Sequence, residues 1–185
     1  MSASLIKELI GQDIWDSYFK FCVVRNPYDK CISAFCHFGK DYQGENKLRL
    51  NNPQVKKMNA EQLRFLSYIQ HKAPVDRDKY IINGEFCLDD VIRYESLEED
   101  IKRISQRIGV PFANKQIPKF KSGIRGEDAT IESLYTELAR EAVGNRYVLD
   151  LKQFGYRFPN STALQSHALG QQKAPLLRRS AFCCR

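Results

Sequence analysis

The stretch from residue 19 to 35, FKFCVVRNPYDKCISAF, decides how this chain of 185 residues folds. Its first six residues are almost all apolar, which predicts a buried strand that is covered on both faces. Asn26 then suits the cap of a helix, and Pro27 suits the first helical position, where its missing N–H is no loss. Gly39 is expected to end this helix. The stretch therefore predicts a strand that turns at once into a helix, with Arg25 at the turn.

Arg25 and Ser33 are candidates for an anion-binding site. Arg25 is expected at the carboxyl end of the strand and beside a helix N-terminus, which is where open α/β sheets bind ligands. The predicted apolar stripe of the helix is Tyr28, Cys31, Ile32 and Phe35. Ser33 lies about 120° from the centre of this stripe on a helical projection, and so does not belong to the apolar face. A forked guanidinium and a hydroxyl can hold one phosphate together.

The stretch resembles the 3′-phosphate-binding element of the sulfotransferases, in which a strand is followed by Arg-Asn-Pro, an aromatic residue, Asp, a basic residue and then Ser. The resemblance implies that Arg25 and Ser33 hold the 3′-phosphate of the sulfate donor, 3′-phosphoadenosine 5′-phosphosulfate. It extends from about residue 4 to 158, because YVLDLKQFGYRF at 147–158 is similar to the closing helix of the family. The alternative is an ordinary strand–helix turn whose arginine forms a salt bridge.

A second segment, DDVIRYESLEED at 89–100, resembles the next strand of the family and the helix after it. The resemblance implies that Tyr94 contacts the adenine of the donor, although a packed strand residue is an equally good interpretation. Glu95 is expected to hold the strand end by hydrogen bonds rather than to take part in catalysis. Ser96 and Glu99 are expected to form a capping box. The buried stripe of this helix is predicted to be Leu97, Ile101, Ile104 and Ile108, with Gly109 and Pro111 at its end.

A third segment, IPKFKSGIRG at 117–126, resembles a basic loop that the family places over the donor. The resemblance implies donor contacts by Lys121, Ser122 and Arg125, with Gly123 allowing the backbone to approach a phosphate. The alternative is a solvated basic loop.

The opening strand of the family and its loop for the 5′-phosphosulfate have no counterpart in this sequence, which begins with an expected amphipathic helix at 4–11. None of the three histidines, His37, His71 and His167, takes the place of the histidine that resembles a general base in carbohydrate-type members. The catalytic residues are therefore unassigned. We expect an amino-terminally incomplete member with an α/β fold: a P-loop-like parallel sheet flanked by helices that lacks the first strand and the 5′-phosphosulfate loop. The open strand edge predicts poor solubility or pairing with another chain.

Further elements are predicted by local signals. A helix is expected at 59–71, with Asn59 and Gln62 as a cap pair, and a hairpin at 80–88 that turns at Asn83 and Gly84. Two helices are expected at 130–143 and 144–154. Residues 1–159 are predicted to form one partial sulfotransferase domain, and residues 160–185 a disordered basic tail. That tail has four basic residues and no acidic one, so it supplies four of the seven net positive charges. A nucleic-acid partner is therefore not expected.

The sequence as a whole predicts a sulfotransferase that moves a sulfuryl group to a hydroxyl of a carbohydrate acceptor and needs no metal. The alternatives are a non-catalytic module that binds 3′-phosphoadenosine 5′-phosphate and a module that binds polyanions. No signal peptide or membrane anchor is visible in the sequence. The resemblance implies a Golgi location if the full-length protein is a eukaryotic carbohydrate sulfotransferase, and a cytoplasmic one otherwise.

Overall fold

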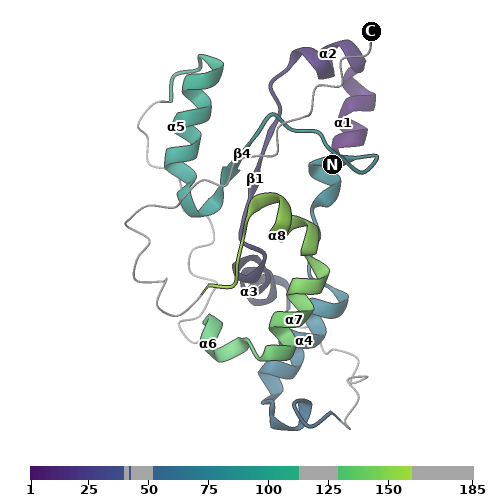
Figure 1. The fold of residues 1–185 in the computed structure, drawn as a ribbon, viewed down its shortest axis with the longest axis vertical. Helices are drawn as coiled ribbons and strands as arrows, with labels where there is room; N and C mark the ends of the chain where they lie inside the picture. Colours follow the sequence, from purple (N-terminus) through teal and green to yellow (C-terminus); the bar gives the residue numbers. More distant parts are fainter. Residues whose placement is uncertain (40–41, 43–51, 113–128, 160–185) are drawn as a thin grey trace. The chain divides into compact units, whose positions relative to one another are not determined.

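The computed structural model describes residues 1–39, 42, 52–112 and 129–159, which are drawn as ribbons in Figure 1. They fall into two compact units. The first unit takes its described residues from Met1–Asn26 and Pro74–Arg125, and the second from Pro27–Ala73 and Gly126–Arg185. The expected basic tail lies outside the described residues. No helix in the described part of the chain is long and apolar enough to cross a membrane.

A pair of parallel strands forms the centre of the first unit. Strand β1 (Phe21–Val24) pairs with β4 (Asp90–Arg93), with Phe21 opposite Asp90 and Val24 opposite Arg93. Within the described residues this sheet has these two strands. The prediction of a parallel α/β sheet is thereby confirmed in its coarse form, a small parallel sheet with helices beside it (Figure 1).

The prediction that the first strand is covered on both faces is wrong. Phe21 and Val23 are 43% and 55% exposed, and within β1 only Val24 is buried. Alternate residues of a strand point to opposite faces, so Phe21 and Val23 share one face. Helix α5 (Leu97–Ile108) of this unit packs chiefly against β4, whose residues Asp90, Val91 and Ile92 are buried. Apolar composition shows that β1 can be buried, but not which element covers it.

The start of α5 differs from the predicted capping box. A 3-10 turn, η3 (Tyr94–Ser96), precedes the helix, and the Ser96 side chain makes no capping hydrogen bond. Its hydroxyl donates instead to Oδ2 of Asp100, at 3.3 Å. Ile104 is buried as expected, whereas Ile108 is 40% exposed and Leu97 and Ile101 are half-buried. The predicted end is confirmed, because Gly109 has φ 72° and the N–H of Val110 donates to the Ser105 carbonyl.

The remaining elements of the first unit are short. Helix α1 (Ala3–Ile10) lies where an amphipathic helix was expected and ends at Gly11, whereas α2 (Gln12–Ser17) was not predicted. Strands β2 (Ile81–Ile82) and β3 (Glu85–Phe86) form the predicted hairpin after the turn η2 (Arg77–Lys79). Asn83 and Gly84 both have positive φ, as a type I′ turn requires.

The second unit is a cluster of helices (Figure 1). Its helices are α3 (Pro27–Phe38), α4 (Ala60–His71), α6 (Ile131–Leu134), α7 (Glu137–Arg146) and α8 (Val148–Phe154), with a 3-10 turn η1 (Val55–Lys57). Both predicted starts are confirmed: α3 begins at Pro27, and Asn59 forms a capping box with Gln62 at α4. The predicted apolar stripe of α3 is buried in the core that these helices share.

The two helices predicted over 130–154 are three in the structure. Tyr135 is extended between α6 and α7, and the Thr136 side chain accepts a hydrogen bond from the N–H of Ala139 at 3.3 Å. Thr130 caps α6 in the same way. Thr136 is thus a second N-cap, six residues after Thr130, and it separates the end of α6 from the start of α7. The prediction of one continuous helix over 130–143 is therefore wrong.

Candidate functional site

The carboxyl ends of β1 and β4 bring two of the predicted site residues together. Because Val24 lies opposite Arg93 in the parallel register, the two residues that directly follow these strands are also neighbours of each other. These residues are Arg25 and Tyr94. Cζ of Arg25 lies 4.3 Å from the centroid of the Tyr94 ring, which is well within the range of a cation–π interaction.

The structure also decides one alternative for Tyr94. The residue belongs to η3 rather than to the strand, and it is 50% exposed. A packed strand residue is therefore excluded. Half of its surface is accessible to a ligand while its ring covers the Arg25 guanidinium.

Glu95 makes the hydrogen bond that was expected of it. Its Oε1 accepts a hydrogen bond from the backbone N–H of Asn26 at 2.6 Å. A carboxylate that accepts from an amide forms one of the stronger hydrogen bonds in proteins. Adjacent residues of η3 thus hold the residue pair Arg25 and Asn26, one through the side chain and the other through the backbone.

A network of buried charges fixes η3, and the sequence reasoning missed it. Asp100 accepts from the backbone N–H of Arg93 at 2.8 Å, from Ser96 and from Nε of Arg103 at 3.1 Å. Arg103 also forms an ion pair with Asp90 and donates to the Val91 carbonyl at 2.9 Å. Both carboxylates are buried and both are paired, as burial of a charge requires. Asp100 and Arg103 lie three residues apart on one helix, a spacing that allows an ion pair, and this was the signal in the sequence that could have revealed the network.

Ser33 lies on α3 in the second unit and is half-buried, on the side away from the apolar stripe. On the same helix, Nζ of Lys30 lies 5.6 Å from the ring centroid of Tyr147. Arg25 and Ser33 belong to different units, so their joint contact with one phosphate stays a prediction. The third predicted group, Lys121, Ser122 and Arg125, lies outside the described residues.

The described histidines lie on helices of the second unit. His37 packs edge-on against the ring of Phe38, with 4.2 Å between centroids. Nδ1 of His71 lies 2.9 Å from the Ser67 carbonyl of its own helix. His167 lies outside the described residues, and the catalytic residues stay unassigned.

Strand β1 also contains a cysteine, Cys22, and a cysteine thiol can act as a nucleophile. Burial, and then the neighbouring Cys87 and Asp76, raise the pKa of its thiol to about 11. The thiolate, not the thiol, is the nucleophilic form of cysteine. Cys22 is therefore protonated at neutral pH and is not a candidate nucleophile.

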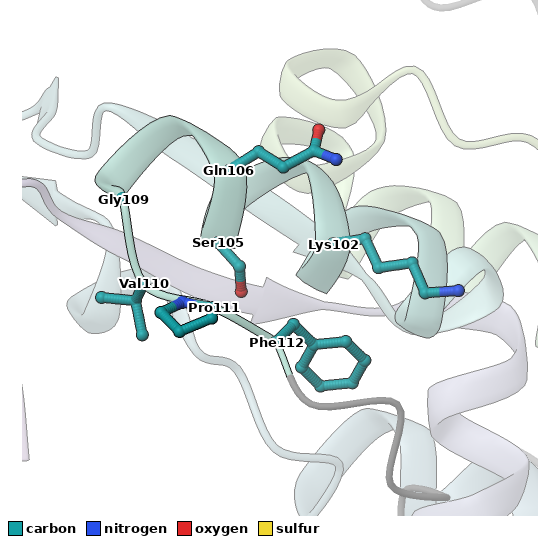
Figure 2. A pocket seen from close by; sticks show the side chains of 7 residues that line it. All are labelled: Lys102, Ser105, Gln106, Gly109, Val110, Pro111 and Phe112. Carbon is teal, nitrogen blue, oxygen red and sulfur yellow. The ribbon is translucent and has the colours of Figure 1, made fainter.

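A shallow hollow lies elsewhere in the first unit (Figure 2). Its volume is about 480 Å³, and it is lined by Lys102, Ser105, Gln106, Gly109, Val110, Pro111 and Phe112. Ser105 points from α5 toward the segment 110–112, whereas Gln106 points away from it. This lining contains none of the predicted site residues. Another hollow, of about 200 Å³, lies beside Thr136 in the second unit and contains none of them either.

Comparison with known proteins identifies similar sequences. The model of the sulfotransferase family matches residues 2–157. The chain is 26% identical over 172 residues to carbohydrate sulfotransferase 14 of Danio rerio, an alignment that covers 78% of this chain and 46% of that protein. It is 29% identical over 111 residues to an uncharacterized protein of Archaeoglobus fulgidus, which covers 60% of this chain and 84% of that protein. The chain thus spans about half the length of the zebrafish relative. No solved structure matches significantly.

Proposed function

The chain belongs to the sulfotransferase family, and we propose from this premise that it binds 3′-phosphoadenosine 5′-phosphosulfate and transfers the sulfuryl group to a carbohydrate hydroxyl. The observation that carries the proposal is Arg25, which lies at the carboxyl end of a parallel strand pair and stacks on Tyr94, while Glu95 binds the backbone N–H of the next residue, Asn26. The name of the zebrafish relative supports a carbohydrate as the acceptor.

Arg25 and Ser33 are proposed to bind the 3′-phosphate of the donor. A guanidinium offers two parallel N–H donors to a phosphate, and a serine hydroxyl offers one more. Arg25 lies where ligands of open α/β sheets bind, beyond the carboxyl ends of the strands. The role of Ser33 rests on its place in the sequence motif, eight residues after Arg25.

The other proposed contacts follow from the same resemblance. Tyr94 lies beside Arg25 and exposes half of its surface, which is compatible with a ligand nearby. Lys121, Ser122 and Arg125 are proposed to add hydrogen-bond donors and positive charge around the donor.

The proposed reaction breaks the bond between sulfur and the bridging oxygen of the donor and forms a bond between sulfur and the acceptor oxygen. The acceptor hydroxyl loses its proton, and 3′-phosphoadenosine 5′-phosphate leaves. By analogy with phosphoryl transfer, positioning and charge stabilisation supply most of the rate enhancement. Arg25 and Ser33 act at the far end of the donor and position it. The Golgi is the proposed location if the complete protein is a eukaryotic carbohydrate sulfotransferase.

A transfer assay tests this function. The purified full chain is incubated with donor labelled with ³⁵S and with a panel of desulfated glycosaminoglycans, and label on the polysaccharide is counted. We expect transfer to at least one acceptor and a loss of tenfold or more in Arg25→Ala, since a charge-assisted hydrogen bond contributes about 1.5–3 kcal/mol. The control is Lys152→Ala, which replaces an exposed residue of α8.

The two alternatives expected from the sequence both leave the polysaccharide unlabelled in this assay, and binding of donor and of polysaccharide to the protein distinguishes them. A module that only binds the nucleotide retains the label as bound donor and transfers none. A module that binds polyanions retains the polysaccharide itself, and salt weakens that binding steeply. Either result contradicts the proposed transfer.

A further inference from the structure

The turn η3 presents two consecutive side chains to the end of β1. Tyr94 covers the guanidinium of Arg25 with its ring, at 4.3 Å, and Glu95 accepts the N–H of Asn26 at 2.6 Å. Two consecutive residues after β4, Tyr94 and Glu95, thus contact two consecutive residues after β1. They restrict both the backbone that carries Arg25 and the direction of its side chain.

The turn itself is held from behind. Asp100 accepts hydrogen bonds from the residues on either side of the Tyr94–Glu95 pair, the N–H of Arg93 at 2.8 Å and the hydroxyl of Ser96 at 3.3 Å. Arg103 binds the other oxygen of Asp100 at 3.1 Å. The ring of Tyr94 is therefore presented by a turn with little freedom of its own, even though half of the ring is exposed.

We propose that Tyr94 is a positioning residue that orients the Arg25 guanidinium for the 3′-phosphate, rather than a residue that recognises the adenine. The inference rests on the proposed function, because it takes the 3′-phosphate as the ligand of Arg25. A free arginine side chain loses rotamer freedom when it binds a phosphate. An arginine that is already stacked on a ring has lost part of this freedom before the ligand arrives, so it binds more tightly.

The two roles of Tyr94 predict different dependences on the phosphate. If Tyr94 acts through Arg25, Tyr94→Leu weakens adenosine 3′,5′-bisphosphate about fivefold and leaves adenosine 5′-monophosphate unchanged, because only the first has a 3′-phosphate. Tyr94→Phe keeps the ring and retains the wild-type preference. In the Arg25→Ala background, Tyr94→Leu has no further effect, since the group that it positions is gone.

The experiment is calorimetric titration of the full chain with both nucleotides, with the weaker one measured by competition. The variants are Tyr94→Leu, Tyr94→Phe, Arg25→Ala and the double variant Arg25→Ala with Tyr94→Leu, each shown to be folded by circular dichroism. Equal weakening of both nucleotides by Tyr94→Leu, also in the double variant, would overturn the inference in favour of adenine recognition. A folded wild type that shows no preference for the 3′-phosphate contradicts the proposed function as well.

A second measurement requires no nucleotide. The ring current of Tyr94 should shift the Nε–H resonance of Arg25 in the nuclear magnetic resonance spectrum, and this shift should persist in Tyr94→Phe and disappear in Tyr94→Leu. A resonance that does not move in Tyr94→Leu would show that the stack does not form in solution, and would overturn the inference independently of any ligand.

Discussion

At the scale of single residues, burial raises the pKa of ionisable side chains in the second unit. Tyr147 is fully buried, and burial raises the pKa of its hydroxyl far above the usual 10.0, with a smaller effect of Cys31. Burial also raises the pKa of Cys31, to about 11. Both groups stay neutral in the folded chain at pH values where they ionise in the unfolded chain.

The consequence is a loss of stability at alkaline pH. The stabilising effect is fully present below the unfolded pKa of tyrosine, near 10, and falls as the pH rises, because the unfolded chain then releases protons that the folded chain retains. Tyr147 alone should account for a loss on the order of 1 kcal/mol at pH 11. We expect Tyr147→Phe to show a smaller decrease in Tm between pH 9 and 11 than the wild type.

Tyr18→Phe is the matched control, because Tyr18 is 67% exposed. The midpoint of thermal unfolding, followed by circular dichroism in a series of buffers, is the measurement. An identical alkaline decrease in wild type and Tyr147→Phe would contradict the assignment of this effect to Tyr147.

At the scale of elements, two glycines with opposite surroundings test how helices of the second unit end and pack. A Cβ at Gly39, just after α3, would lie 2.5 Å from the Phe35 ring and 2.6 Å from its carbonyl oxygen. A Cβ at Gly144, inside α7, would meet the Tyr28 hydroxyl at 3.6 Å, which is an ordinary contact.

Gly39→Ala should therefore destabilise the chain by about 1–3 kcal/mol, the cost of overpacking. Gly144→Ala should stabilise it by up to about 1 kcal/mol, because alanine favours a helix interior. Urea unfolding of both variants gives the two free energies. If Gly39→Ala stabilised the chain, residue 39 could not lie as close to the ring and carbonyl oxygen of Phe35 as the structure places it.

The same scale shows what the sequence could predict. The start of α3, the capping box of α4 and the turn at Asn83 and Gly84 depend on residues close in the chain, and they were found where they were expected. The capping box at Ser96 failed because Asp100, which also binds Arg93, competes for its hydroxyl. The exposure of Phe21 and Val23 depends on which elements cover β1, which local pattern does not contain.

The candidate site, too, was predictable only where it depends on residues close together in the sequence. Arg25 was found from the strand and helix signals beside it, and Glu95 from its place at the end of a strand. The stack of Arg25 on Tyr94 joins residues that lie 69 positions apart, and it depends on the register of a parallel pair. No periodicity within either segment specifies that register, so this contact became visible only in the structure.

At the scale of the whole molecule, charge offers a competing account of anion binding. The chain has a net charge of +7, four of which come from residues 160–185. Diffuse attraction to a basic chain falls steeply with salt, whereas a directed contact between a guanidinium and one phosphate depends on which phosphate is present. Phosphate position and salt therefore separate a donor site from a generally basic surface.

The most direct test of the donor site is calorimetric titration of the purified full chain with adenosine 3′,5′-bisphosphate and adenosine 5′-monophosphate, each at low and at physiological salt. The account predicts saturable binding of one bisphosphate, at least about tenfold tighter than the monophosphate at both salt concentrations, and loss of this preference in Arg25→Ala with Ser33→Ala. Equal affinity for the two nucleotides, or no binding by the folded chain, would contradict it.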